Sequence, residues 1–186
     1  NVGLGDLELS EDGNTLYAIN IGAKQLMVIQ LQSAPLSVSS VKAQKLPQPA
    51  DCAAAQTHPF GLGLNNGKVY VGMVCGGPSD SDLKGYVYEY NGGALSKKLS
   101  FPLDYARATD NTLLNPAGNS VHSFTNWSTT PVSGAALTAA AKTAPWLTDI
   151  AFDGGDMVLG FRSRWVDQIG DATTTVGGEI LRACGN

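Results

Sequence analysis

Asp6-Leu-Glu-Leu-Ser-Glu-Asp-Gly-Asn-Thr-Leu-Tyr-Ala-Ile-Asn20 decides the fold, because two alternating runs of apolar residues flank an Asp-Gly turn and predict a β-hairpin. We expect Asp12 and Gly13 to supply the positive φ angles of that turn. Similar hairpin patterns recur at 59–72 and 147–160, and a further strand-like run follows each hairpin, at 25–31, 85–90 and 179–183. A meander repeated in this way predicts the blades of a β-propeller, since one small sheet cannot bury both of its faces.

The number of meanders predicts an incomplete propeller. Three meanders are fewer than the four to eight blades that close a propeller, and both termini look cut from a longer polypeptide. We therefore expect an all-β chain in which 1–186 form a single propeller-like domain or a fragment of one. Open ends would expose strand edges and apolar faces, so we expect further domains of the same polypeptide, or other protein chains, to cover exposed blade edges.

The stretches between the meanders differ in length. Segments 33–50 and 94–105 are each predicted to contain an outer strand, and the strand in 94–105 is expected to end at Pro102. A long loop excursion is expected over 106–146, as either a binding or assembly surface or an irregular solvated loop. Its alanine-rich part, 134–144, is the one short helix that the sequence predicts.

Composition narrows the class of partner. The 186 residues carry a net charge of −4, only 15% are charged, and 22 glycines and nine prolines supply many turn formers. An acidic chain without a cluster of Lys and Arg argues against a nucleic-acid partner. The sequence contains no apolar run of the roughly 20 residues that a membrane-spanning helix needs, so we expect no transmembrane segment.

The three cysteines bear on the compartment. Cys52 and Cys75 flank the second hairpin, whose strands run out and back, so we predict a disulfide between them that contributes roughly 3 kcal/mol. Such a bond indicates an oxidising, extracellular location; two buried free thiols are the alternative. Zinc is disfavoured, because the chain has no Cys-x-x-Cys motif and only two histidines, His58 and His122. Cys184 either pairs outside this chain or is buried.

A resemblance extends over most of the chain. It rests on ordered segments, namely Gly3–Tyr17, Pro59–Leu64, Gly67–Val71 with Cys75, Phe101–Tyr105, Asp149–Asp153, Gly160–Arg164 and Gly178–Cys184. Together they resemble the propeller-like region of large bacterial secreted proteins, which commonly accompanies SdrD-type B-repeat domains. The resemblance implies an exported, surface-associated protein with further domains, and it carries over no catalytic residue.

Two groups of residues are candidates for binding. Asp6 and Asp149 occupy matching positions in the first and third hairpins, with Gly61 at the corresponding place in the second. Inner strands of a propeller converge on its axis, so the two carboxylates could bind calcium there, or each could accept hydrogen bonds from loop amides. Arg162 and Arg164, followed by Trp165, put two cations on one strand face. They are candidates for contact with an acidic ligand, or for ion pairs with Asp167 or Asp171.

The sequence therefore predicts a non-catalytic binding or structural module of a secreted or cell-surface bacterial protein. No catalytic residue is predicted, because no nucleophile is paired locally with either histidine. A calcium-dependent, lactonase-like propeller hydrolase with Asp6 and Asp149 at an axial site is one alternative. A building block of an extracellular layer or filament is another. Calcium is the one cofactor that these hypotheses involve, and it would bind at Asp6 and Asp149.

Overall fold

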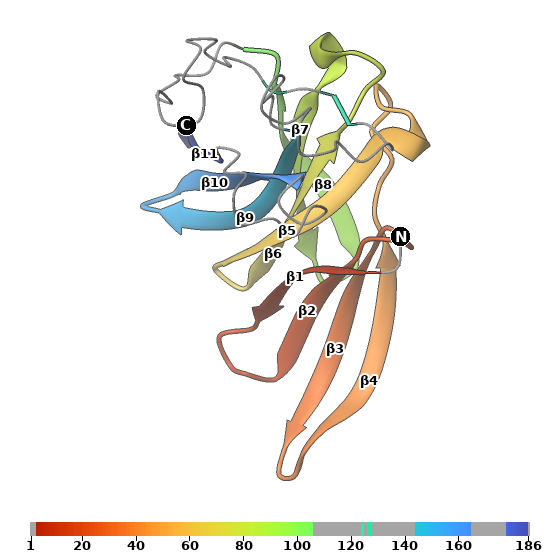
Figure 1. Cartoon of the computed structure of the whole chain (residues 1–186). Coiled ribbons are helices and arrows are strands. Elements are labelled where there is room, and N and C mark those ends of the chain that lie inside the picture. Colours follow the sequence, from red (N-terminus) through yellow and green to blue (C-terminus); the bar gives the residue numbers. More distant parts are fainter. Residues whose placement is uncertain (1–2, 106–123, 125, 128–143, 165–177, 186) are drawn as a thin grey trace, which may run out of the picture.

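The computed structural model describes residues 3–105, 124, 126–127, 144–164 and 178–185 (Figure 1). These residues form an all-β structure of three small antiparallel sheets, as the sequence predicts. Part of the predicted helix, 134–143, lies outside the described residues, as does most of the 106–146 excursion. Among the described residues, no helix combines the length and the apolar character needed to cross a membrane.

Each sheet is an antiparallel meander of consecutive strands. Sheet 1 contains β1 (Leu4–Leu9), β2 (Thr15–Asn20), β3 (Gln25–Ser33) and β4 (Leu36–Lys45). Sheet 2 contains β5 (Thr57–Asn65), β6 (Lys68–Cys75), β7 (Lys84–Asn91) and β8 (Ala94–Pro102). Sheet 3 contains β9 (Pro145–Asp153), β10 (Asp156–Ser163) and β11 (Glu179–Ala183). Short 3₁₀ turns, η1 (Ala54–Gln56) and η2 (Asp80–Asp82), lie on either side of the β5–β6 hairpin. Every strand pair that the sequence predicts is present.

Sheet 2 is packed between the other two sheets, and this arrangement creates two cores. Strand β6 shows most clearly why sheet 2 contributes to both cores, because its side chains alternate between them. Val69, Val71 and Met73 belong to the core shared with sheet 1. Tyr70 and Val74, in contrast, belong to the core shared with sheet 3. The continuous run of buried residues in β6 therefore packs against sheet 1 on one face and against sheet 3 on the other.

A one-residue β-bulge recurs at the same place in the first strand of every sheet. It falls between Leu4 and Leu7 in β1, between Pro59 and Leu62 in β5, and between Leu147 and Asp149 in β9. A bulge locally bends its strand and increases its twist. Because the three bulges occupy equivalent positions, the three hairpins are equivalent in structure as well as in sequence.

Glycines allow the first strands to approach one another closely. A Cβ atom added at Gly5 of β1 would lie 2.8 Å from the carbonyl oxygen of Phe60 in β5. One added at Gly61 of β5 would lie 2.8 Å from the carbonyl oxygen of Leu147 in β9, and one at Gly63 would overlap the carbonyl of Ile150. Backbone therefore meets backbone where β5 passes β1 and β9, and no side chain larger than hydrogen fits.

The first hairpin turn differs in one detail from the prediction. Gly13 has a φ of +72°, but Asp12 is not among the residues with positive φ, so the prediction for Asp12 is wrong. The Asp12 carboxylate instead accepts hydrogen bonds from the Ser10 hydroxyl and from the Asn14 backbone N–H. An Asp that ties down a turn through its side chain does not need the left-handed conformation.

The predicted disulfide is confirmed. Cys52 and Cys75 are bonded across 23 positions of sequence, and both are buried beside sheet 2. The bond connects the segment that follows sheet 1 to the end of β6. Nearby, Asp51 pairs with Lys84 at 2.7 Å and accepts a hydrogen bond from the Tyr86 hydroxyl at 3.0 Å. Cys184 is a free, exposed thiol, so the expectation that it could be buried is wrong.

The close strand contacts predict a large effect of a single methyl group. Gly63→Ala should lower the free energy of unfolding by about 1–3 kcal/mol, because β9 must move away from the new Cβ atom. Gly93→Ala is the matched control, since a Cβ at Gly93 meets nothing within 4 Å. Urea unfolding of both variants measures the difference. Equal stability of the two variants would show that β5 and β9 are not in contact.

Candidate functional site

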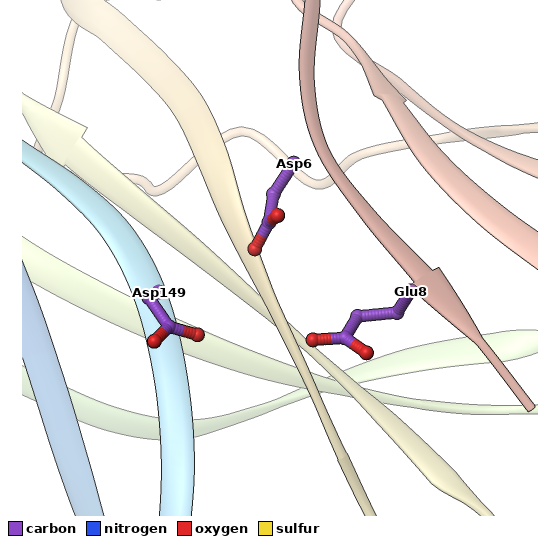
Figure 2. Close-up of side chains that lie close together, drawn as sticks. All are labelled: Asp6, Glu8 and Asp149. Atoms are coloured by element: carbon purple, nitrogen blue, oxygen red, sulfur yellow. The ribbon is translucent and has the colours of Figure 1, made fainter. Parts of the chain in front are cut away.

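Three carboxylates meet where the first strands converge. Asp6 and Glu8 extend from β1 toward Asp149 of β9, and one oxygen from each lies within 4.8 Å of the other two (Figure 2). Asp6 is held in place by backbone amides: its Oδ2 accepts a hydrogen bond from Leu62 N–H at 3.0 Å, and its Oδ1 accepts one from Leu7 N–H at 2.8 Å. The structure therefore brings together the two aspartates that the sequence singles out.

Glu8 is a member of this cluster that the sequence analysis missed. It lies two residues after Asp6 on the same strand, and alternation in a β-strand places residues i and i+2 on one face. That spacing was the available signal. Gly61 of the second hairpin, which occupies the corresponding place, leaves room there for Asp149 to approach.

The cluster is electrostatically unfavourable when it is fully ionised. Burial raises the pKa of Asp6, the amides of Leu62 and Leu7 oppose that rise, and the charge of Asp149 adds to it. Burial also raises the pKa of Glu8, and the charges of Asp6 and Asp149 raise it further. Three carboxylates in this arrangement supply the oxygen ligands that a hard divalent cation such as calcium prefers, and water would complete its coordination.

Arg162 of β10 and Arg164, which directly follows β10, contact aromatic rings. The Arg164 guanidinium lies 4.5 Å from the ring centroid of Trp127, and only 8% of Arg164 is exposed. The Arg162 guanidinium lies 5.5 Å from the centroid of Phe60. Each contact has the geometry of a cation–π interaction. Trp165, the third predicted contact residue, lies outside the described residues, as do Asp167 and Asp171.

Trp127 is the centre of an aromatic cluster. Its ring stacks on His58 with centroids 3.7 Å apart, and its Nε1–H donates to the carbonyl oxygen of Pro145 at 2.9 Å. Trp146 contacts Trp127 edge-on, and it contacts Phe60 in the same way. The cluster ties residue 127, from the predicted loop excursion, to sheets 2 and 3. Sequence spacing offered no signal for these contacts.

His58 is a buried, neutral member of this cluster. Its Nε2 is shielded from solvent and has no hydrogen-bond partner among the residues that the structure describes. Burial, with smaller contributions from the charges of Lys24 and Arg164, lowers the pKa of His58 to about 3. An imidazole that stays neutral and stacked at physiological pH contributes packing, and it is poorly suited to exchange protons with a substrate.

A groove of about 440 Å³ opens between sheets 1 and 2. On the side of sheet 1 it is lined by Tyr17, Val28 and Lys42, and on the side of sheet 2 by Val69 and Tyr90. Burial raises the pKa of Tyr17, and the neighbouring Tyr90 adds to the rise. The groove marks the place where the two sheets diverge beyond their shared core.

Comparison with known proteins places the chain near the colossins of Dictyostelium discoideum. Colossin-A is 25% identical over 97% of this chain, colossin-D is 27% identical over 98%, and colossin-B is 28% identical over 97%. The matched region makes up 2%, 18% and 5% of those proteins, respectively, so the chain spans less than a fifth of the curated relatives it matches. No family model matches the chain.

The acidic cluster predicts a charge effect on stability. A carboxylate whose pKa is raised on folding destabilises the folded protein at neutral pH, and that cost disappears as the pH falls through the raised pKa. Asp149→Asn should therefore bring the pKa of Asp6 and of Glu8 closer to normal, and should stabilise the fold at pH 7 by about 0.5 kcal/mol. Carboxyl NMR titration and thermal unfolding measure the two effects.

Asp104→Asn is the control for this experiment, because the charge of Asp104 contributes to neither pKa. An unchanged pKa of both Asp6 and Glu8 in Asp149→Asn would show that the three carboxylates are not neighbours.

His58 predicts an acid-dependent loss of stability. Its folded pKa of about 3 lies below the usual value near 6.5, so protonation favours the unfolded chain. The His58 contribution is fully present above pH 6.5 and is lost as the pH falls toward 3, with a slope approaching about 1.4 kcal/mol per pH unit. His58→Phe keeps a stacking ring and should remove this slope in urea unfolding measured from pH 7 to pH 4. The same slope in wild type and variant would contradict the burial of a neutral His58.

Proposed function

We propose that this chain is a non-catalytic structural and binding module of an exported protein, built from consecutive blades of an incomplete β-propeller. The observation that carries the proposal is the equivalence of the three sheets. Each begins with a strand that has a bulge at the same position, and consecutive sheets stack face to face in chain order. Repeated sheets that stack around a common centre are the defining feature of propellers.

The location outside the cell is supported by the disulfide between Cys52 and Cys75, because such bonds persist in oxidising compartments. The sequence resemblance to bacterial secreted proteins agrees with an exported module. The colossins are eukaryotic proteins much longer than this chain, so the bacterial source and the SdrD-type neighbouring domains remain predictions. The module would act through loops and open sheet faces, with other domains of its polypeptide or other protein chains as partners.

A non-catalytic role is supported by the environment of the candidate residues. In the part of the chain that the structure describes, the single imidazole is that of His58, which is neutral and stacked on Trp127. Arg164, the more buried of the two candidate arginines, lies over the same ring. These side chains hold sheets 2 and 3 together, which is a structural role.

A calcium-dependent hydrolase is the second candidate function. The trio of Asp6, Glu8 and Asp149 favours it, because a cation held by these carboxylates would lie at the centre of the three sheets. That cation would neutralise charges that otherwise repel, so calcium would raise the melting temperature. Hydrolysis would need, in addition, a water molecule activated by the metal.

One experiment on the full-length protein in its own host tests the proposal. A membrane-impermeant amine reagent added to intact cells should label the protein. Mass spectrometry after alkylation without reduction should find Cys52 joined to Cys75. A protein that resists labelling and has both thiols free would contradict export. Calcium-dependent turnover of lactones that is lost in Asp6→Asn and Asp149→Asn would favour the hydrolase instead.

A further inference from the structure

The outer face of sheet 1, which points away from sheet 2, is apolar and uncovered. Strand register places the same side of all four strands on it. We call this the β1–β4 outer face and define it by its exposed large apolar side chains, Leu4, Leu7, Leu9, Leu36, Val38 and Val41. Of the large hydrophobic residues that are exposed in the described part of the chain, all except Ile180 lie here. Exposure ranges from 51% for Leu7 to 77% for Leu36.

The equivalent faces of the other two sheets are buried. Because the bulges align, Leu4 and Leu7 of β1 correspond to Pro59 and Leu62 of β5, and to Leu147 and Ile150 of β9. Leu62 is fully buried against sheet 1, and Leu147 and Ile150 are buried against sheet 2. In each case this face packs on the preceding sheet of the stack. The β1–β4 outer face therefore has the position and the chemistry of a face that packs on a preceding sheet.

Sheet 3 leaves the complementary face open at the other end of the stack. The register makes Tyr17 of β2 equivalent to Val158 of β10, and Tyr17 faces sheet 2. The corresponding side of sheet 3 carries three apolar side chains, Ala151, Val158 and Ile180, and Ile180 is 76% exposed. The same side also carries Arg182, which the register places directly opposite Val158 and which pairs with Asp153 and Asp156. A protein interface as a whole is only about as apolar as the rest of a protein surface, so a face that mixes apolar and paired charged side chains can form one.

We propose that a second copy of this chain occupies the β1–β4 outer face, with its sheet 3 packed against sheet 1 of the first copy. The inference rests on the proposed function, because it extends the stacking of sheets within the chain to stacking between chains. A head-to-tail contact made twice closes a dimer with two-fold symmetry. The described part of each copy contains three sheets, so two copies supply six of them, within the four to eight that close a propeller, whereas three copies would supply nine.

The size of the surface agrees with a stable dimer. The exposed leucine and valine side chains of the β1–β4 outer face offer on the order of 600 Å² per contact, near the roughly 800 Å² that each partner contributes to a standard interface. The closed dimer makes this contact twice. A face-to-face pairing of two β1–β4 outer faces would bury one apolar patch and leave Ile180 of both copies exposed. Head-to-tail packing covers both ends.

The mass of the 186-residue chain in solution tests the dimer. The chain should sediment at twice its 19.4 kDa at micromolar concentration. Val41→Glu places a charge in the β1–β4 outer face, so it should weaken the dimer at least about tenfold while the circular dichroism is unchanged. Ser40→Glu is the matched control, since Ser40 is also exposed, lies on the opposite side of β4 and receives the same charge. A monomeric wild-type chain, or equal effects of the two variants, would overturn the proposal.

Cross-linking tests the head-to-tail arrangement. Within the chain, Tyr17 of sheet 1 and Val69 of sheet 2 line one groove. Their equivalents are Val158 of sheet 3 and Leu16 of sheet 1, so these two positions should be neighbours between copies. In a Cys184→Ser background, a mixture of Leu16→Cys and Val158→Cys chains should give mixed dimers with a short bismaleimide. Links between two Leu16→Cys chains would overturn the head-to-tail packing.

The two proposals fail in different ways. A monomeric chain whose Cys52–Cys75 bond forms on the cell surface would overturn the dimer and leave the exported module in place, its open faces covered by other sheets of the same polypeptide. A dimer found only in a cytosolic protein with free thiols would contradict export and leave the dimer in place.

Discussion

The backbone contact of β5 with β1 and β9 is the constraint on which the rest of the structure depends. Hydrogen is the only side chain that fits at Gly61 and Gly63, because carbonyl groups of β9 occupy the space that a Cβ would need. That contact sets the distance between the sheets, and the distance decides which side chains fill the two cores. Met73 and Val74, adjacent in β6, are each fully buried but belong to different cores, because successive side chains of a strand point to opposite faces of the sheet.

Convergence of the first strands also explains why like charges meet. Asp6 and Asp149 lie near the bulges of β1 and β9, where the strands bend toward a common centre. A cluster of carboxylates costs stability unless protons or cations neutralise it. The fold tolerates the cluster because solvent screens Asp149, which is exposed, and because backbone amides satisfy Asp6. The same centre thus combines close backbone contacts with a cluster of like charges.

The sheets at the two ends of the stack differ from the middle sheet in how many of their faces are buried. Sheet 2 buries both of its faces, and its residues Leu62, Val71 and Val87 are inaccessible to solvent. Sheets 1 and 3 each bury one face and leave the other open. A single sheet with apolar side chains on both faces cannot bury them without other sheets packed against it. The apolar open face of sheet 1 is where a further sheet would bury the most apolar surface, and Lys45 is the one charged residue that the register places on that face.

The sequence by itself determined the strands, the order of the meanders and the disulfide, because these depend on alternation, turn residues and short-range geometry that the chain carries locally. Asp6 and Asp149 could be recognised in the same way, from matching positions in repeated hairpins. Tertiary structure alone decided that Glu8 completes the acidic cluster, that Arg164 and His58 both contact the ring of Trp127, and that sheet 1 keeps an apolar face open. Those outcomes depend on how far apart whole sheets pack, and that distance is set by backbone contacts between segments more than 50 residues apart in sequence, such as Gly5 with Phe60.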